Sequence, residues 1–566
     1  MSSFSSYKRL LKTKPLIRFV SFLSCVAVAV GLSLFLGKES SKKPIITSIN
    51  PPIASPEDIL IITGSNFGEL KENSYVSIAN SRITNSKYIS WNDTEIKIKL
   101  PSNVQDGLVT VITQAGVSTP AFFANKSSIP TTVRQDPKAT IPIIQSITTE
   151  NNAETAIIGQ TITISGMNFN TSRGNSKVYF SENQETASED DFITALSSNY
   201  DYEYWSDDEI KLRVPDNAVS GRVYVETERG KSEPFPIQIS FPVGKKTFSR
   251  PRTYVLQTSV NIKPETEHTD ALITLYMPRP QESTFQSEVT TNSISPEPLI
   301  QDDMFNIIFQ DSLDKIVNQN TTYSATHIVK TYTITSNIIP NKVGNYSDKT
   351  KMLYKSYLSQ DEGVPSLNPK VTELKNTIIG KTKNNYEKAK LIYNYMIKNY
   401  TIIDNTKSDS TTDYSTVSPV DLISTGTGDA YSFAIIFTAL CRAAGIPAVP
   451  LGGVLIDTQY TTKNHWWTEL YFEKYGWFPV DIALGAGLEY SPFTEIIDKK
   501  DYYFGNIDNQ HISFCRGWNQ IKSPFIKSRI VKRPRSYALQ SIWEEARGTE
   551  SNYSSLWNAP AIIGIY

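Results

Sequence analysis

The fold of this chain is decided by the stretch GTGDAYSFAIIFTALCRAAGIPAVPLGGV at 426–454, together with NHWWTELYFEKYGWFPVD at 464–481. The first part predicts a buried helix from Asp429 to Ala444, because apolar residues recur there every three or four positions. The residues at this spacing are Ala430, Phe433, Ala434, Phe437, Cys441 and Ala444. Gly445-Ile446-Pro447 ends the helix, because glycine suits the last turn and proline cannot continue it.

The second part predicts an antiparallel β-hairpin. Alternation places one set of residues on a single face of its first strand, namely His465, Trp467, Glu469 and Tyr471. A charged turn at 473–476 folds the chain back into 477–481. If the turn sets a register with both residues on one face, Asp481 lies beside His465.

A helix N-terminus facing an imidazole backed by a carboxylate is the arrangement that a thiol nucleophile requires. The helix end and the imidazolium both lower a cysteine pKa, and the carboxylate fixes the histidine tautomer. The stretch resembles the core of the transglutaminase-like superfamily, whose members carry G-x-C at the helix start, then ALxRxxGIPA, an H-x-W-x-E strand and a GW-x-x-D strand. Every part is present here except the cysteine, whose position holds Ala430. The resemblance implies a papain-like α+β core with His465 and Asp481 as the remaining catalytic-site residues.

Without its nucleophile, a triad enzyme loses on the order of 10⁶-fold in turnover. What remains is a cleft with an imidazole and a carboxylate that is still able to bind a peptide or a glutamine-like side chain. Its aromatic walls are expected from Tyr431, Trp466, Trp467 and Trp477. The alternative is a hydrogen-bonded pair, His465 and Asp481, that only stabilises the hairpin. The chain shows no tag, so Ala430 is treated as native, although an engineered Cys-to-Ala change would give the same sequence.

Other side chains were weighed as replacement nucleophiles. Cys441 follows Ala430 by eleven positions, about 16 Å along the helix axis, and is expected to be a buried small hydrophobe with a raised pKa. Ser432 points to the other side of the helix. The location of Cys515 is not fixed by the sequence. An active cysteine peptidase or protein-glutamine acyl transferase that uses Cys515, or a thiol from a partner chain, therefore remains the alternative.

The N-terminus predicts a membrane anchor. Five basic residues between Lys8 and Arg18 precede an apolar run from 19 to 36. At 1.5 Å per residue the run reaches about 27 Å, close to a bilayer core of roughly 30 Å. We expect a cytoplasmic segment at 1–18, a transmembrane signal-anchor at 19–37 and an extracytoplasmic remainder, periplasmic or at the cell surface. A cleaved signal peptide with its site at 27–29 is the rival interpretation.

A repeat links 44–125 to 142–243. ITGSNF at 62–67 matches ISGMNF at 164–169, and WNDTEIKIKLP from Trp91 matches WSDDEIKLRVP from Trp205. Each copy shows short alternating strands between Gly, Asn and Pro turns, which is typical of a small β-sandwich. Both copies resemble IPT/TIG domains, which are immunoglobulin-like modules, and a Pro-containing linker at 126–141 joins them. They serve either as adhesion modules or as a spacer.

The rest of the chain is divided by composition and by the resemblance. A β-rich domain is expected at 248–345, the transglutaminase-like core at 349–500, with a helix at 385–399, and a C-terminal extension packed on the core at 501–566. His511 falls in this extension. It is assigned to packing or hydrogen bonding, although an approach to the cleft stays open.

Composition limits the partners. A formal net charge of −1 gives no reason to expect nucleic acid binding. Four His and three Cys, with no pair at ligand spacing, predict no metal site, and no cofactor is expected. The sequence thus predicts a membrane-anchored, extracytoplasmic transglutaminase-like pseudoenzyme that binds an envelope or cell-surface protein or peptide.

Overall fold

The computed structural model describes residues 42–126, 140–150, 152–182, 192–264, 271–313, 321–404, 418–522, 528–531, 536–548 and 553–566. The chain forms two compact units that divide after Lys126. The transmembrane helix predicted at 19–37 lies outside the described residues. Within the described ranges, no helix has the length and apolar character needed to cross a membrane.

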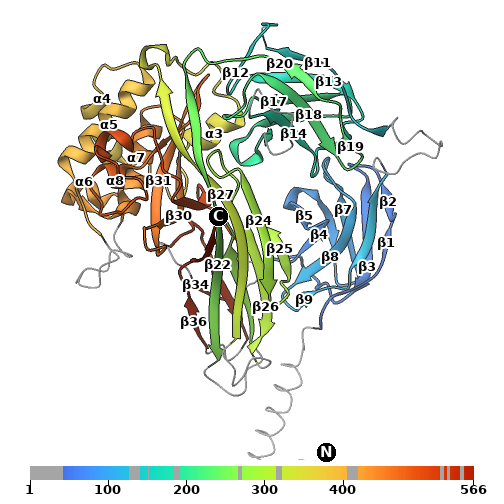
Figure 1. Ribbon diagram of the computed structural model, residues 1–566. Coiled ribbons are helices and arrows are strands. Elements are labelled where there is room, and N and C mark those ends of the chain that lie inside the picture. Colours follow the sequence, from blue (N-terminus) through green and yellow to red (C-terminus); the bar gives the residue numbers. More distant parts are fainter. Residues whose placement is uncertain are drawn as a thin grey trace, which may run out of the picture. The chain divides into compact units, whose positions relative to one another are not determined.

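The first unit contains a β-sandwich (Figure 1). One sheet has the order β1-β3-β7-β6, and the other has β2-β10-β8-β4-β5 with β9 on β8. Inward-facing residues alternate with exposed ones, as at Leu60 and Ile62 of β3. The strands are β1 Ile45–Asn50, β2 Ile53–Ala54, β3 Ile59–Ser65, β4 Tyr75–Ile78, β5 Ser81–Arg82, β6 Tyr88–Trp91, β7 Glu95–Lys99, β8 Gly107–Thr113, β9 Gly116–Val117 and β10 Ala121–Asn125.

A second sandwich opens the second unit and repeats the first. Its sheets have the orders β11-β13-β17-β16 and β15-β14-β18-β19, with β20 on β18, and β12 pairs with β21. The strands are β11 Ile143–Thr149, β12 Ala156–Ile157, β13 Thr161–Met167, β14 Lys177–Ser181, β15 Phe192–Thr194, β16 Tyr202–Trp205, β17 Glu209–Arg213, β18 Gly221–Thr227, β19 Gly230–Lys231, β20 Phe235–Ile237 and β21 Ile239–Ser240.

The predicted repeat is confirmed at the level of single hydrogen bonds. The indole Nε1 of Trp91 donates to the carbonyl oxygen of Phe67 at 3.1 Å, and Trp205 donates to Phe169 at 2.8 Å. Both tryptophans pack against the core of their own sandwich. They therefore serve a structural purpose in each copy.

A further pair of sheets follows the second sandwich and is built around two long strands, β22 and β27, which pair with each other along most of their length. The sheets have the orders β24-β27-β22-β36, with β37 on β22, and β25-β26-β23-β35-β34. The strands before the core are β22 Gly244–Pro264, β23 Leu272–Pro278, β24 Glu288–Ser295, β25 Ile300–Asp303, β26 Asn306–Ser312 and β27 Thr321–Ile338.

The core domain places a small antiparallel sheet, β32-β31-β30-β33, against helices (Figure 1). Helix α7 contacts β30 and β31 on one side and α4 and α5 on others. Its side chains from Ala430 to Arg442 are therefore all buried, and the single buried face predicted from periodicity understates its burial. The helices are α3 Met352–Leu358, α4 Pro369–Ile379, α5 Asn385–Asn399, α6 Asp421–Thr425, α7 Ala430–Ala443, α8 Ile482–Gly485 and α9 Lys499–Tyr502; the strands are β28 Thr401–Ile402, β29 Thr427–Gly428, β30 Ala448–Ile456, β31 Thr462–Phe472, β32 Gly476–Val480 and β33 His511–Arg516.

The C-terminal segment does more than pack on the core. Its first strand, β33, enters the core sheet as the neighbour of β30. The later strands complete the preceding β domain, because β35 pairs with β23, and β36 and β37 pair with β22. These strands are β34 Arg529–Val531, β35 Glu544–Arg547, β36 Tyr553–Trp557 and β37 Ala561–Ile565. The core and the β domain therefore share one hydrophobic core.

Candidate functional site

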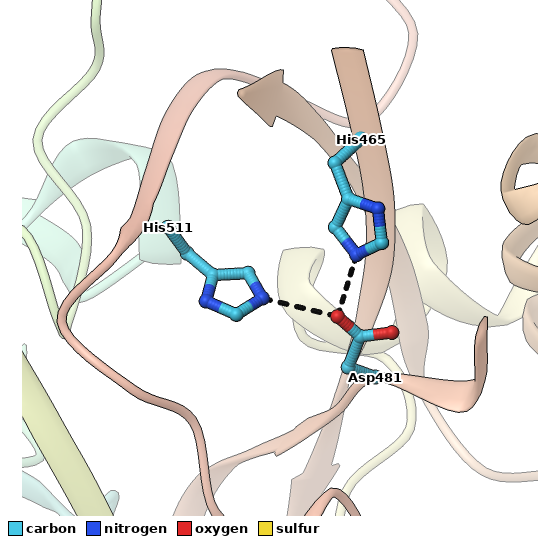
Figure 2. A group of neighbouring side chains, drawn as sticks. All are labelled: His465, Asp481 and His511. Carbon is cyan, nitrogen blue, oxygen red and sulfur yellow. Dashed lines mark hydrogen bonds and ion pairs between the residues drawn. The ribbon is translucent and has the colours of Figure 1, made fainter. Parts of the chain in front are cut away.

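The β31–β32 hairpin brings His465 and Asp481 together. The register pairs Thr468 with Val480, so the end of β32 lies near the start of β31. His465 Nε2 and Asp481 Oδ2 are 2.6 Å apart, and both side chains are buried (Figure 2). The contact predicted from the hairpin is present. Since Nε2 is held by the carboxylate, Nδ1 is the ring nitrogen directed away from Asp481.

Asp481 is also the N-cap residue of α8. Its Oδ1 accepts a hydrogen bond from the Leu484 backbone N–H at 2.9 Å, and its own N–H donates to the carbonyl oxygen of Tyr503 at 3.0 Å. A capping carboxylate has few rotamers left, because one oxygen is committed to the helix. The second oxygen, Oδ2, is therefore aimed at His465 by the backbone itself.

A second histidine, His511 of β33, reaches the same oxygen. Its Nε2 lies 3.0 Å from Asp481 Oδ2 (Figure 2). Its Nδ1 lies 2.9 Å from Asp508 Oδ1. Burial by itself would lower the pKa of His511, but the two carboxylates outweigh it and raise the pKa to about 9. Burial would raise the pKa of Asp481, yet attraction to both rings and their hydrogen bonds hold that pKa below its usual range.

The hydrogen-bonding role expected of His511 is thus present, but its place beside Asp481 was not foreseen from the sequence. It follows Asp481 by 30 positions, and no local pattern connects the two. The strand order supplies the connection, because β33 pairs with β30, the neighbour of β31. The only local signal is the pair Asp508 and His511, three residues apart.

The side chain of residue 430 lines a pocket together with His465. Ala430 is the first residue of α7, and Asp429 caps that helix by accepting a hydrogen bond from the Ser432 N–H at 2.9 Å. The pocket has a volume of about 260 Å³. Its lining is Ile403, Asp404, Asp429, Ala430, Leu455, Asp457, Lys463, Asn464, His465, Trp466, Leu488, Glu489, Tyr490 and Ser491. The N-terminus of α7 and the imidazole of His465 therefore line the same pocket, as the motif predicts.

Two polar atoms on the pocket wall are buried and have no hydrogen-bond partner among the described residues. They are the indole Nε1 of Trp466 and the amide Oδ1 of Asn464. One is a donor and the other an acceptor. A buried group without a partner costs free energy, so neither atom is satisfied by the described protein itself.

Three of the aromatic residues predicted to line the cleft do not line this pocket. Trp467 shares a face of β31 with His465 but packs near Phe285, outside the pocket lining, and Trp477 packs against Tyr471. Tyr431 packs edge-on against Trp466, with ring centroids 5.6 Å apart. Only Trp466 of the predicted set forms part of the wall. Alternation along β31 places Trp466 and Trp467 on opposite faces and groups Trp467 with His465, yet the pocket is lined by His465 and Trp466.

Neither described thiol is placed to serve as the nucleophile. Cys441 is fully buried in α7, and burial raises its pKa, as predicted. Cys515 is buried in β33 opposite Gly452 of β30, whereas His465 is on β31, the strand beyond. Two strand spacings amount to about 9.6 Å. Burial raises the pKa of Cys515 to about 12, and its sulfur accepts a hydrogen bond from the Leu539 N–H. Cys515 is not among the residues that line the pocket with His465.

The second sandwich is docked on the hairpin that carries the site. Asp216 Oδ2 accepts hydrogen bonds from the Trp477 N–H at 2.8 Å and from Lys246 Nζ at 2.6 Å. Lys246 also donates to the carbonyl oxygens of Tyr475 and Trp477. Gly476, between them, has φ of 90°, and a Cβ there would lie 1.8 Å from Asp216 Oδ1. The turn between β31 and β32 is therefore shaped to admit Asp216.

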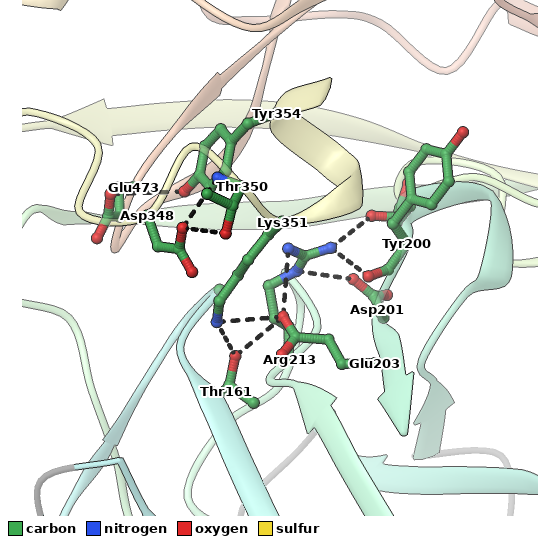
Figure 3. Close-up of polar contacts among 12 residues, drawn as sticks. Thr161, Tyr200, Asp201, Glu203, Arg213, Asp348, Thr350, Lys351, Tyr354 and Glu473 are labelled. Carbon is green, nitrogen blue, oxygen red and sulfur yellow. Dashed lines mark hydrogen bonds and ion pairs between the residues drawn. The ribbon is translucent and has the colours of Figure 1, made fainter. Parts of the chain in front are cut away.

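More ion pairs extend this junction. Lys351, just before α3, donates to Thr161 Oγ1 at 2.7 Å and pairs with Glu203 at 3.2 Å (Figure 3). Arg213 of β17 lies between Asp201 and Glu203. Burial raises the pKa of Asp201 to about 7, although attraction to Arg213 opposes this. The second sandwich is therefore packed against the core through buried hydrogen bonds and ion pairs.

The core is therefore an α+β domain in which the start of α7 and the His465 imidazole line one pocket, with Asp481 hydrogen-bonded to that imidazole. Residues 372–482 match the transglutaminase-like superfamily, and residues 44–132 and 142–241 match the IPT/TIG domain. The chain therefore contains a transglutaminase-like core and two IPT/TIG domains, as its motifs predict.

Individual relatives cover smaller or more distant parts. A cyclomaltodextrin glucanotransferase of Paenibacillus macerans is 31% identical over 86 residues, which span 15% of this chain and 12% of that protein. A proposed cysteine protease from Cytophaga hutchinsonii matches at 15% identity and a TM-score of 0.34, covering 56% of this chain and 93% of its own. The periplasmic domain of TgpA from Pseudomonas aeruginosa matches at 13% identity and a TM-score of 0.23, covering 43% and 88%.

Proposed function

We propose that this protein is a membrane-anchored, extracytoplasmic transglutaminase-like protein that binds a polypeptide amide without reacting with it. One observation carries the proposal: Ala430 occupies the first position of α7 on the pocket that His465 also lines. A methyl group has no lone pair, so no acyl-enzyme bond is formed at this position. Both described thiols are buried outside the pocket lining.

The pocket wall supports an amide as the bound group. The unpartnered Trp466 N–H and Asn464 Oδ1 match the carbonyl and the N–H of a carboxamide or a peptide bond. Carboxylates outnumber the lysine on the wall, with Asp404, Asp429, Asp457 and Glu489 against Lys463. An anionic side chain is disfavoured there by like-charge repulsion. A glutamine side chain is therefore favoured over glutamate.

The test uses short acetylated peptide amides that differ only in glutamine or glutamate, titrated into the purified protein by calorimetry. Binding of the glutamine peptide is expected to weaken about tenfold in Trp466→Phe, because one hydrogen bond worth about 1–1.5 kcal/mol is lost. Trp518→Phe is the matched control, since its indole N–H is also buried and unpartnered but lies outside the pocket lining. Ala430→Trp is expected to abolish binding by filling the pocket.

Chemical turnover is measured on the same samples. No amide hydrolysis, no amine incorporation and no thioester are expected from the natural chain. Turnover that iodoacetamide abolishes would contradict the proposal, and so would equal affinity for the two peptides. Anchoring is tested separately by membrane fractionation: the full chain is expected in the membrane fraction, and a chain lacking 1–41 is expected outside it. A full chain that fractionates away from membranes refutes the anchor.

A further inference from the structure

His465, Asp481, His511 and Asp508 form a buried chain of alternating imidazoles and carboxylates. The successive contacts are 2.6, 3.0 and 2.9 Å. His465 Nε2, Asp481 Oδ2 and His511 Nε2 all lie within 4.8 Å of one another. Figure 2 shows both rings turned toward the same carboxylate oxygen. Amide binding in the pocket makes no use of His511 or Asp508.

The negative charges of Asp481 and Asp508 in this buried cluster have to be balanced inside the protein. Asp481 receives hydrogen bonds from the two histidines and the Leu484 N–H. The other hydrogen-bond donors to Asp508 are the hydroxyls of Tyr490 and Tyr503 and the Gln510 N–H. No lysine or arginine of the described chain is among these donors. Two protonated imidazoles or one divalent cation would balance the charges of the two buried carboxylates.

The surroundings of the donor atoms are those of metal ligands. A metal-binding histidine usually donates its other ring N–H to a carboxylate, which fixes the tautomer and the ring orientation. Asp508 does this for His511 Nδ1 and leaves Nε2 directed at Asp481. The Leu484 N–H holds Asp481 Oδ1 and leaves Oδ2 directed at both histidines. Asp481 and His511 are thus each oriented by a residue other than these three side chains, whereas His465 is not.

We propose that His465 Nε2, His511 Nε2 and Asp481 Oδ2 form a binding site for a divalent transition-metal cation of the Zn²⁺ type. Two imidazoles and one carboxylate are a common protein ligand set for such ions. Ligands 2.0–2.1 Å from a tetrahedral ion are about 3.3 Å apart. The present 2.6 and 3.0 Å separations would have to widen by about 0.7 and 0.3 Å, with loss of the protons now shared.

The proposal is independent of amide binding, since the ligand atoms are those turned toward Asp481 and the amide contacts are on Trp466 and Asn464. It is tested by equilibrium dialysis of the full chain against Zn²⁺, with metal content measured per chain. One tightly held ion is expected. His511→Gln is expected to weaken binding by at least 100-fold, and Asp508→Asn by about 10- to 100-fold, the range for a lost carboxylate partner.

His327→Gln is the matched control. This histidine is also fully buried, but its ring nitrogens face the hydroxyls of Thr258 and Thr291 and no carboxylate. Zinc affinity is expected to stay unchanged in this variant. No bound zinc in the natural chain, or equal binding by natural chain and His511→Gln, overturns the proposal.

If His511→Gln fails to fold, two measurements on the natural chain still test the metal site. Titration with Co²⁺ is expected to produce visible d–d absorption that Zn²⁺ then removes. In nitrogen-15 spectra with zinc in excess, His511 Nε2 is expected to lose its proton. A doubly protonated His511 ring under those conditions would show that protons, not a metal, balance the charge, and it would overturn the proposal.

Discussion

Replacing Ala430 with cysteine tests whether this site is still built to hold a thiolate. Residue 430 begins α7 and lines the pocket with His465. The positive helix end favours an anion there by about 1 kcal/mol. In the metal-free protein, an imidazolium at position 465 would add about 4 kcal/mol if it lay about 4 Å from the sulfur, at an effective dielectric constant near 20.

Asp429 opposes both effects, because its carboxylate caps the same helix start. If this repulsion removes about half of the attraction, about 2.5 kcal/mol remains, which is close to two pKa units. We therefore expect the introduced thiol to have a pKa of about 6.5, against about 8.5 for an ordinary thiol.

The assay is the rate of reaction with a disulfide reagent, dithiobis(nitrobenzoic acid), followed from about pH 5 to pH 9. At pH 6 a pKa near 6.5 leaves about a quarter of the thiol ionised, against about 0.3% for a pKa near 8.5. The lower basicity makes each thiolate about eightfold less reactive, so a net gain of about tenfold is expected. The natural chain supplies the baseline, since Cys441 and Cys515 are buried.

The matched control is Ala430→Cys combined with His465→Gln. It removes the imidazole and is expected to return the midpoint of the rate profile most of the way to 8.5. A midpoint near 8.5 in the single variant, or the same midpoint with and without His465, would refute the argument that the pocket still stabilises a thiolate.

Three further predictions concern the junction between the second sandwich and the hairpin. Gly476→Ala should lower the free energy of unfolding in urea more than Gly487→Ala, because both glycines have positive φ but only a Cβ at 476 meets Asp216; equal losses would contradict the docking. Lys246→Met should cost about 3–5 kcal/mol by leaving Asp216 buried without its cation, and Lys246→Met/Asp216→Asn should recover most of it in the same titration. Burial raises the pKa of Asp201 from 3.8 to about 7, so stability is full below pH 3.8 and falls by up to about 4 kcal/mol as the pH rises to about 7. Asp201→Asn should flatten that fall in thermal unfolding curves, and an unchanged slope would exclude Asp201 as its source.

Local patterns predicted the elements of the core well. The helix expected at 385–399 has those bounds, and Asn384 caps it through the Glu387 N–H. The hairpin register followed from two-residue alternation, since a shift by one residue would have moved His465 away from Asp481. Such features depend on neighbours in the sequence, which is why a single chain suffices to predict them.

Contacts between distant segments could not be predicted in the same way. His511 meets Asp481 because β33 joins the sheet after the chain has passed through α8 and α9. Asp216 meets Gly476 from another domain, and the positive φ of this glycine is the only trace of the contact within the hairpin. Alternation separated Trp466 from Trp467 but did not assign either face to the pocket. Each of these depends on which surfaces pack together, which no periodicity encodes.

The three positions of the proposed site have unequal structural roles, and this difference would account for the loss of a nucleophile with retention of its partners. Asp481 caps α8 and accepts hydrogen bonds from two buried histidines, so its removal would leave several donors unsatisfied. His465 is buried against that carboxylate, and its removal would leave a buried charge with one partner fewer. The side chain of residue 430 has no comparable role in hydrogen bonding or charge pairing. Alanine is a strong helix former, and its methyl group satisfies no polar partner. Stability alone therefore preserves the imidazole and the carboxylate but not the thiol. A His–Asp pair on this scaffold is evidence of a well-packed hairpin, and only the side chain at position 430 carries information about covalent chemistry.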